Sequence, residues 1–150
     1  MQVESPEASP ENTVTSSTRI PLLANGTIDL ECGSTTNNVE RQKQVAYTNT
    51  HFLTASRYVT KKASKINSID DLKGKSVVST AGSTNIKQLT EANGARNLNV
   101  NIIPAKDHAE AFLMVETDRA VAFVMDDILL ASLVAGSKAP DDYVISKDAF

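Results

Sequence analysis

Short apolar runs alternate with helix-like segments from about residue 51 to residue 146, and this alternation restricts the fold more than any other feature of the 150-residue chain. The runs HFLTASRYVT, KSVVST, NVNIIPA, AVAFVM and DYVIS have the length and residue types of strands. Helical patterns lie between the last four of them. Apolar strands that alternate with helices predict an α/β fold, in which a mostly parallel sheet carries helices on both faces.

Start and stop signals support the predicted helices. SIDDLKG has a Ser three residues before an Asp, which is typical of a capped turn of helix. A helix is expected to open at AGSTN and to end at Gly94, and another opens with Asp107 as its cap and Glu110 at its third position. The segment DDILLASLVAG predicts a further helix, capped by an Asp and ended by Gly136.

The first third of the chain is less regular. Residues 1–14 combine Pro, Ser, Glu and Asn and are expected to form a flexible lead. SSTRIPLLANG predicts a short helix, and the alternating TIDLE predicts a strand.

Composition excludes several classes of protein. A net charge of -3 and a pI near 5.3 give no reason to expect nucleic acid or an anionic membrane as a partner. No apolar run approaches the roughly 18 to 20 residues that span a bilayer. The first twelve residues have neither the basic start nor the apolar stretch of a secretory signal. A single cysteine excludes an intrachain disulfide.

Residues suited to a ligand site follow four of the predicted strands, at the strand ends where ligands of open α/β sheets bind. They are Ser34, Thr35 and Thr36 after TIDLE, Gly82, Ser83 and Thr84 after KSVVST, Lys106, Asp107 and His108 after NVNIIPA, and Asp126 and Asp127 after AVAFVM. Each of these residues also suits a helix cap or a solvated loop. The stretch ECGSTTNNVERQKQ is accordingly either a ligand loop or a polar loop with a helix start.

The joint inventory favours an amino acid as ligand. Arg19, Arg41 and His108 supply cationic or proton-bearing groups, and Asp126 supplies a carboxylate. An α-amino acid needs an Arg for its carboxylate, an acid for its ammonium group, and hydroxyl or backbone donors around them.

Enzyme and metal chemistry have little support in the sequence. The pattern AGST lacks the spacing and the Lys of a phosphate-binding loop, and no zinc spacing is present. Cys32 and His108 could form a nucleophile and base, although a small buried Cys is the favoured interpretation. The sequence therefore predicts a binding module with no catalytic residue, no cofactor and no metal.

Four segments carry a resemblance to a known family. RIPLLANGTIDLECGSTTNNVERQKQVAYTNT, DLKGKSVVSTAGST, AKDHAEAF and RAVAFVMDDILLA resemble the glutamate/aspartate-binding members of the periplasmic solute-binding proteins that serve ABC transporters. The likeness runs from about Thr15 to Tyr143. CGSTTNNVERQKQ and AFVMDD are its specific motifs, whereas DLKGK is common to binders of polar amino acids.

The resemblance implies a fold and a set of ligand contacts. The fold would be of the type II periplasmic-binding-protein kind, with one near-complete lobe. The contacts would be Arg41 with Ser34, Thr36 and Thr84 for the ligand α-carboxylate, Asp126 for its ammonium group, and Ser16, Arg19 and His108 for its side-chain carboxylate. The ligand would be an acidic amino acid, the partner an ABC transporter permease, and the location the periplasm.

The chain departs from the family in length, because family members have two lobes and roughly twice as many residues. Residues 15–50 would be a remnant of the first lobe, residues 51–146 a second-lobe domain, and residues 147–150 a tail. Apolar faces of RIPLL and TIDLE would then lack their family partners, so a homodimer or an exchange of segments is expected to cover them.

Two other functions remain open at this stage. A truncated solute-binding relative could act as an oligomeric interaction or structural protein that no longer binds the ligand. An enzyme on the same fold is the third hypothesis, because one fold hosts unrelated functions. Retention of Arg41, Thr36, Thr84, His108 and Asp126 favours the binding module over the interaction protein, whereas loss of the first-lobe portion favours the interaction protein. The enzyme has the least support, because no general base other than His108 is placed.

Overall fold

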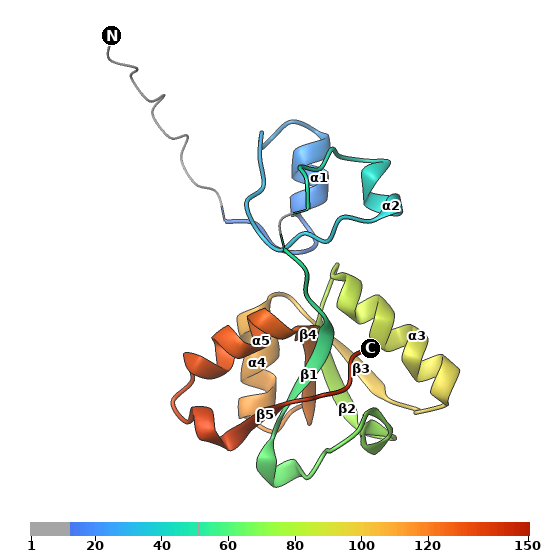
Figure 1. Cartoon of the computed structure of the whole chain (residues 1–150), viewed down its shortest axis with the longest axis vertical. Helices are drawn as coiled ribbons and strands as arrows, with labels where there is room; N and C mark the ends of the chain where they lie inside the picture. The colour runs from blue at the N-terminus through green and yellow to red at the C-terminus, as the bar shows by residue number, and fades with distance from the viewer. Residues whose placement is uncertain (1–12, 51) are drawn as a thin grey trace.

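The computed structural model describes residues 13–50 and 52–150, which form a small N-terminal segment next to a sheet with helices on both faces (Figure 1). Most of the flexible lead predicted for residues 1–14 lies outside the described residues. The strands are β1 Ser56–Lys61, β2 Ser76–Thr80, β3 Asn101–Ala105, β4 Ala122–Asp126 and β5 Tyr143–Ile145. The α-helices are α1 Arg19–Ala24, α2 Val39–Gln42, α3 Thr84–Arg96, α4 His108–Glu116 and α5 Asp127–Ala135. Three short 3₁₀ helices are η1 Lys62–Ser64, η2 Ile69–Leu72 and η3 Pro140–Asp142.

The sheet has the strand order β3-β2-β4-β1-β5. Strand β2 pairs in parallel with β3 and β4, whereas β1 is antiparallel to both of its neighbours. The mostly parallel α/β sheet is therefore confirmed, with β1 as the one strand that runs the other way. The chain enters β1 from the end at which β4 finishes, so Ser56 pairs with Asp126.

The core has two halves, one on each face of the sheet, because neighbouring residues of a strand point to opposite faces. Val77 packs with Leu89 of α3 on one face, and Val78 packs with Phe112 of α4 and Leu130 of α5 on the other. These side chains are at most 5% exposed. Burial of each stabilises the fold by about 1.5–3 kcal/mol, which holds the strand ends in fixed positions.

The N-terminal segment, residues 13–50, has no comparable core. Ile20 is its only buried apolar side chain. The strand predicted at TIDLE is wrong, since residues 27–31 have no strand assignment and no partner strand within the described chain. A strand needs a neighbour to satisfy its backbone groups. Here the amides of Thr27 and Ile28 both donate to the carbonyl of Leu22, which closes the turn after α1.

Local signals were mostly correct at helix starts and less so at ends. Ser68 and Asp71 form the expected capping box, and the Asp107 side chain accepts from the backbone N–H of Glu110. The predicted end at Gly94 is wrong, because α3 continues to Arg96 and Asn97 takes the left-handed conformation instead, at φ 51°. Asparagine tolerates this conformation, so it can end a helix as glycine does.

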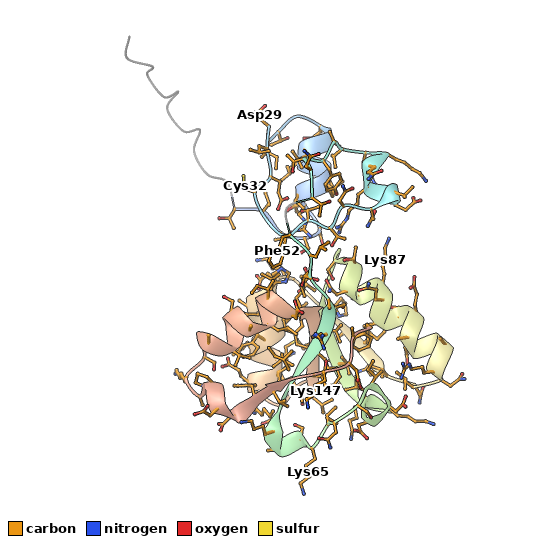
Figure 2. All side chains as sticks on the ribbon, viewed as in Figure 1. Asp29, Cys32, Phe52, Lys65, Lys87 and Lys147 are labelled. Carbon is orange, nitrogen blue, oxygen red and sulfur yellow. The ribbon has the colours of Figure 1, made fainter. Side chains whose placement is uncertain are left out.

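Two further expectations are corrected. The strand predicted from residue 51 begins only at Ser56, because the chain first crosses from the N-terminal segment to the sheet; Phe52 lies on this connection (Figure 2). Cys32 is exposed and not the small buried residue that was expected. Within residues 13–50 and 52–150, no helix is both long and apolar enough for a membrane crossing.

Candidate functional site

The N-terminal segment lies over the edge of the sheet where β2 and β4 end and β1 begins (Figure 1). Hydrogen bonds hold it against the β2–α3 loop. The Ser17 hydroxyl donates to the carbonyl of Ala81 at 3.1 Å, and the hydroxyls of Thr36 and Thr84 share a hydrogen bond of 3.1 Å. Hydroxyl groups of the N-terminal segment thus join it to the sheet domain.

Gly82 allows the two parts to approach closely. Its φ of +76° is a conformation that favours glycine. A Cβ at this position would lie 2.8 Å from the Cα of Ser17 and 2.9 Å from the carbonyl oxygen of Ser16. Both atoms belong to the backbone, so a side chain at position 82 would push the N-terminal segment away.

Arg41 spans the boundary between the parts. Helix α2 positions it, because Asn38 caps this helix and accepts from the Arg41 backbone N–H at 2.9 Å. Its guanidinium donates to the carbonyl of Thr36 at 3.0 Å and to that of Gly82 at 3.2 Å. Arg41 and Gly82 both line a cavity of about 290 Å³.

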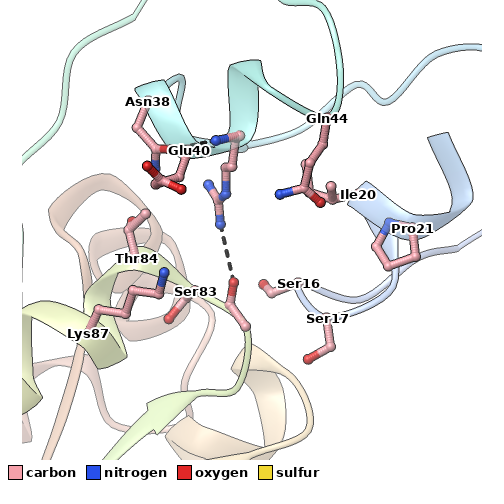
Figure 3. Close-up of a pocket in the computed structure, with 12 residues that line it drawn as sticks. Ser16, Ser17, Ile20, Pro21, Asn38, Glu40, Gln44, Ser83, Thr84 and Lys87 are labelled. Atoms are coloured by element: carbon pink, nitrogen blue, oxygen red, sulfur yellow. Dashed lines mark hydrogen bonds between the residues drawn. The ribbon is translucent and has the colours of Figure 1, made fainter. Parts of the chain in front are cut away.

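This first cavity is lined mostly by polar residues, with Ile20 and Pro21 among the apolar ones, and lies between the N-terminal segment and the start of α3 (Figure 3). Ser16, Arg41 and Thr84, all predicted site residues, line it. Ser83 caps α3 by accepting from the N–H of Ile86. The first turn of this helix faces the cavity, because Ser83, Thr84 and Lys87 line it.

Asp126 is a buried carboxylate at the end of β4, with an exposure of 6%. The side-chain amide of Asn85 donates to it at 2.9 Å and also contacts the Ser56 hydroxyl at 3.0 Å. No cation of the described residues lies within ion-pair distance of Asp126. A buried carboxylate is costly without an opposite charge, so Asp126 is suited to receive a cationic ligand group.

A second cavity of about 320 Å³ adjoins Asp126. The predicted site residues Ser34 and Thr36 line it together with Asp126. The apolar side chains of Phe52, Leu53 and Ile128 form another part of its wall. This combination of a few convergent polar groups with an apolar wall is typical of small-molecule sites.

Arg19 is a buried cation in the N-terminal segment, with an exposure of 6%. Its nearest carboxylate is that of Glu31, at 3.8 Å from Nη1 to Oε1, and its Nε has no hydrogen-bond partner among the described residues. Burial lowers the pKa of the guanidinium from its ordinary value, Glu31 opposes this, and Arg41 lowers it further. Arg19 therefore has one buried N–H group without an acceptor among the described residues.

His108 lies in the same field of charges. Its Nδ1 shares a hydrogen bond of 2.7 Å with the hydroxyl of Thr80 at the end of β2. Burial lowers the pKa of the imidazole, and Arg19 lowers it further, whereas Asp126 and Asp107 raise it. The net lowering of the pKa favours the neutral form of the ring.

The predicted site residues thus gather around one edge, in different ways. Ser16, Arg41 and Thr84 line the first cavity, and Ser34, Thr36 and Asp126 the second. The Thr36–Thr84 hydrogen bond joins the two groups. Arg19 and His108 interact electrostatically with each other and with Asp126.

Sequence reasoning missed four residues of this region. Glu31 adjoins Arg19, Asn85 and Ser56 surround Asp126, and the Tyr47 hydroxyl donates to the Thr36 carbonyl at 3.3 Å. None carries a sequence signal of its own. Ser56 lies near Asp126 because β1 begins beside the end of β4, and this pairing is known only once the strand order of the sheet is known.

The arrangement offers cationic groups, a buried carboxylate and several hydroxyls around two cavities, which the Thr36–Thr84 hydrogen bond connects. Across the part of the chain that the structure describes, no cluster of three or more His, Cys, Asp and Glu side chains is placed to hold a metal. The geometry fits reversible binding of a small charged molecule at the boundary of an α/β lobe. These features define the class as that of small-solute-binding proteins.

The chain belongs to the bacterial extracellular solute-binding proteins, family 3, whose family model matches residues 7–142. It is 54% identical over 134 residues to the L-glutamate/L-aspartate-binding protein of Pseudomonas aeruginosa, and covers 44% of that protein with 89% of its own length. It is 52% identical over 132 residues to the glutamate/aspartate import solute-binding protein of Escherichia coli, with 88% and 44% covered. The resemblance read from the sequence is confirmed, and the chain spans less than half the length of these curated relatives.

Solved structures agree on the fold. An ancestral arginine-binding protein bound to arginine has a TM-score of 0.82 at 28% identity, covering 93% of this chain and 61% of that one. The cysteine-binding protein of Campylobacter jejuni has a TM-score of 0.80 at 23% identity, covering 91% and 53%. The fold is therefore of the type II periplasmic-binding-protein kind, and the chain spans about half to three fifths of the length of these structures.

Proposed function

We propose that this chain binds an acidic amino acid, L-glutamate or L-aspartate, as the solute-binding component of an ABC importer. The observation that carries the proposal is that two buried charged side chains of opposite sign, Asp126 and Arg19, lie at one sheet edge, each with an incomplete set of partners. Asp126 has no cation at ion-pair distance among the described residues, and the Nε of Arg19 has no acceptor there. A dicarboxylic amino acid carries the complement of both groups.

Each group of the ligand has a proposed partner. Arg41 would bind the α-carboxylate, with Ser34, Thr36 and Thr84 as further donors, and Asp126 would bind the ammonium group. Arg41 now donates to two neutral carbonyls. A carboxylate is a stronger acceptor than a carbonyl, so exchange of one of these contacts for the ligand is favourable.

The ligand side chain distinguishes acidic from neutral amino acids. Ser16, Arg19 and His108 would receive its carboxylate. Arg19 is buried and His108 is largely neutral in the free protein, so both gain from an added negative charge. The names of the relatives in Pseudomonas aeruginosa and Escherichia coli support this choice of ligand.

Organisation and location belong to the same proposal. Residues 15–50 would be part of a first lobe, residues 51–146 a second lobe and residues 147–150 a tail, with the ligand between the lobes. The protein would act outside the cytoplasm, in the periplasm, and deliver its ligand to a membrane permease without catalysis. The family description and the word "import" in the name of the relative from Escherichia coli support this role.

A second copy of the chain is proposed to cover the apolar surface of the N-terminal segment. Leu30 and Val39 are each 69% exposed, and the segment has only one buried apolar side chain, Ile20. Sedimentation equilibrium tests this part, with a dimer as the expected result. A monomer at all concentrations would refute the dimer.

Isothermal calorimetry with L-glutamate tests the function, with L-glutamine and L-arginine as controls. Binding of L-glutamate with weaker or no binding of the controls is the expected result. No heat with L-glutamate or L-aspartate from a folded sample would refute the proposal. Preference for L-arginine would refute the assigned roles of Arg19 and His108.

A further inference from the structure

Glu31 is a charged residue of the site that the proposed function leaves without a role. It belongs to the loop between α1 and α2, and its side chain is only 11% exposed. Its carboxylate lies beside Arg19, whose side chain is 7% exposed. A glutamate in this place is unexpected, because a second carboxylate near Arg19 repels the acidic ligand that Arg19 is proposed to bind.

The contact between Glu31 and Arg19 is loose. The distance of 3.8 Å between Oε1 and Nη1 exceeds that of a hydrogen bond, and Arg19 Nε has no partner among the described residues. The other carboxylate oxygen of Glu31 accepts from the Thr35 hydroxyl at 2.7 Å. Glu31 therefore keeps a good partner of its own if Arg19 turns to another anion.

Gly33 provides the space for this carboxylate. A Cβ at position 33 would lie 2.3 Å from Glu31 Oε1, closer than any two such atoms can approach. The atom that it meets is the end of a flexible side chain, and the φ of Gly33 is outside the region that favours glycine. A side chain at position 33 would thus displace the Glu31 carboxylate without straining the backbone.

We infer that Glu31 is an internal counter-ion, which neutralises Arg19 in the ligand-free protein and gives way to the side-chain carboxylate of an acidic ligand. This inference rests on the proposed function. A buried Arg19 is costly without a negative charge nearby, and Glu31 is the carboxylate of the described residues that lies within ion-pair distance of it. The ligand carboxylate takes over this role, so Glu31 opposes the binding of dicarboxylic ligands and has little effect on their amides. Glu31 thereby determines specificity.

The test compares L-glutamate and L-glutamine by calorimetry in the wild type and in Glu31→Gln, together with the melting temperature of the ligand-free proteins. The matched control is Glu91→Gln, which removes the same charge from an exposed position of α3. In Glu31→Gln, Arg19 is left unpaired until the ligand arrives. We expect a lower melting temperature without ligand, and a ratio of L-glutamate to L-glutamine affinity raised by about fivefold or more, which is the lower end of typical couplings between two sites.

The outcomes separate this inference from the proposed function. A wild type that binds neither ligand overturns both. A wild type that binds L-glutamate, with an unchanged or lower affinity ratio in Glu31→Gln, overturns the counter-ion alone. Damage to the fold would weaken both ligands and would not raise the ratio. If Glu31→Gln does not fold, Gly33→Ala takes its place, because it displaces the carboxylate; an unchanged ratio in that variant also overturns the inference.

Discussion

Substitution of Gly82 by Ala tests whether the close approach of the two parts of the molecule supports binding. The new Cβ would lie 2.8 Å from the Cα of Ser17, and ordinary contact begins at 3.4 Å. The N-terminal segment must therefore retreat by about 0.6 Å, since neither backbone can give way alone. This retreat would lengthen two hydrogen bonds. The bond from Ser17 to Ala81 is now 3.1 Å long, and the bond from Arg41 to Gly82 is 3.2 Å long.

The magnitude follows from these two bonds. Both would reach about 3.7 Å or more, which is beyond hydrogen-bond length. The neutral bond contributes about 0.5–1.5 kcal/mol and the bond from the charged Arg41 about 1.5–3 kcal/mol. Ligand affinity falls as the closed arrangement loses population, so a loss of about 2–4.5 kcal/mol means a Kd roughly 30- to 2,000-fold higher.

Gly74→Ala is the matched control. Gly74 has a φ of +70°, close to the +76° of Gly82, but a Cβ there meets no atom within 4 Å. Both substitutions strain the backbone by about 1–2 kcal/mol and lower the melting temperature. Only Gly82→Ala should also weaken the binding of L-glutamate in calorimetry. Wild-type affinity in Gly82→Ala, or an equal loss in both variants, would refute the argument.

Three further predictions concern the charged residues. Arg41→Ala should weaken L-glutamate binding by about 2–5 kcal/mol in calorimetry, because it strands a desolvated carboxylate; a loss below about tenfold would contradict the role of Arg41. Asp126→Asn should raise the Kd for L-glutamate by about tenfold or more. Circular dichroism should show an intact fold, because Asn85 can still donate to the remaining side-chain oxygen. Unchanged affinity would exclude Asp126 as the partner of the ligand ammonium group. Binding of L-glutamate should take up a proton at His108 and strengthen as the pH falls from about 8 toward 6, because the ligand carboxylate raises a pKa that burial and Arg19 hold down in the free protein. The stability of the free protein should show the opposite trend and decrease as the pH falls through the lowered pKa of His108. His108→Gln should therefore flatten the pH dependence of both affinity and stability. A pH dependence of affinity that persists in this variant would assign the proton uptake to another group.

Local signals predicted much of the sheet domain because its elements are specified by nearby residues. Apolar runs became β2, β3, β4 and β5, and the cap pairs Ser68–Asp71 and Asp107–Glu110 formed as expected. The prediction of a strand at TIDLE failed because a strand depends on a neighbour far along the chain, and no local pattern reveals that the described residues contain none for it. Likewise, both Gly94 and Asn97 suit a helix end, and only packing decides between them.

The site could be predicted as a set of residues but not as a geometry. Strand ends indicated Asp126 and Thr84, and family likeness indicated Arg19 and Arg41. The sequence did not reveal that Asn85 and Ser56 hold Asp126 in place, since these contacts span 41 and 70 positions. The proximity of Glu31 to Arg19 was equally hidden, because no local pattern relates residues twelve positions apart in an irregular segment.

The lack of an apolar core in residues 13–50 has a consequence for cooperativity. The sheet domain has its own buried side chains, whereas the order of α1 and α2 depends mainly on polar contacts with another part of the chain. Amide hydrogens of these helices should therefore exchange with solvent through partial opening, well below the free energy that unfolds the sheet. A ligand held between the two parts would slow this exchange. Ligand binding would then complete the ordering of the N-terminal segment.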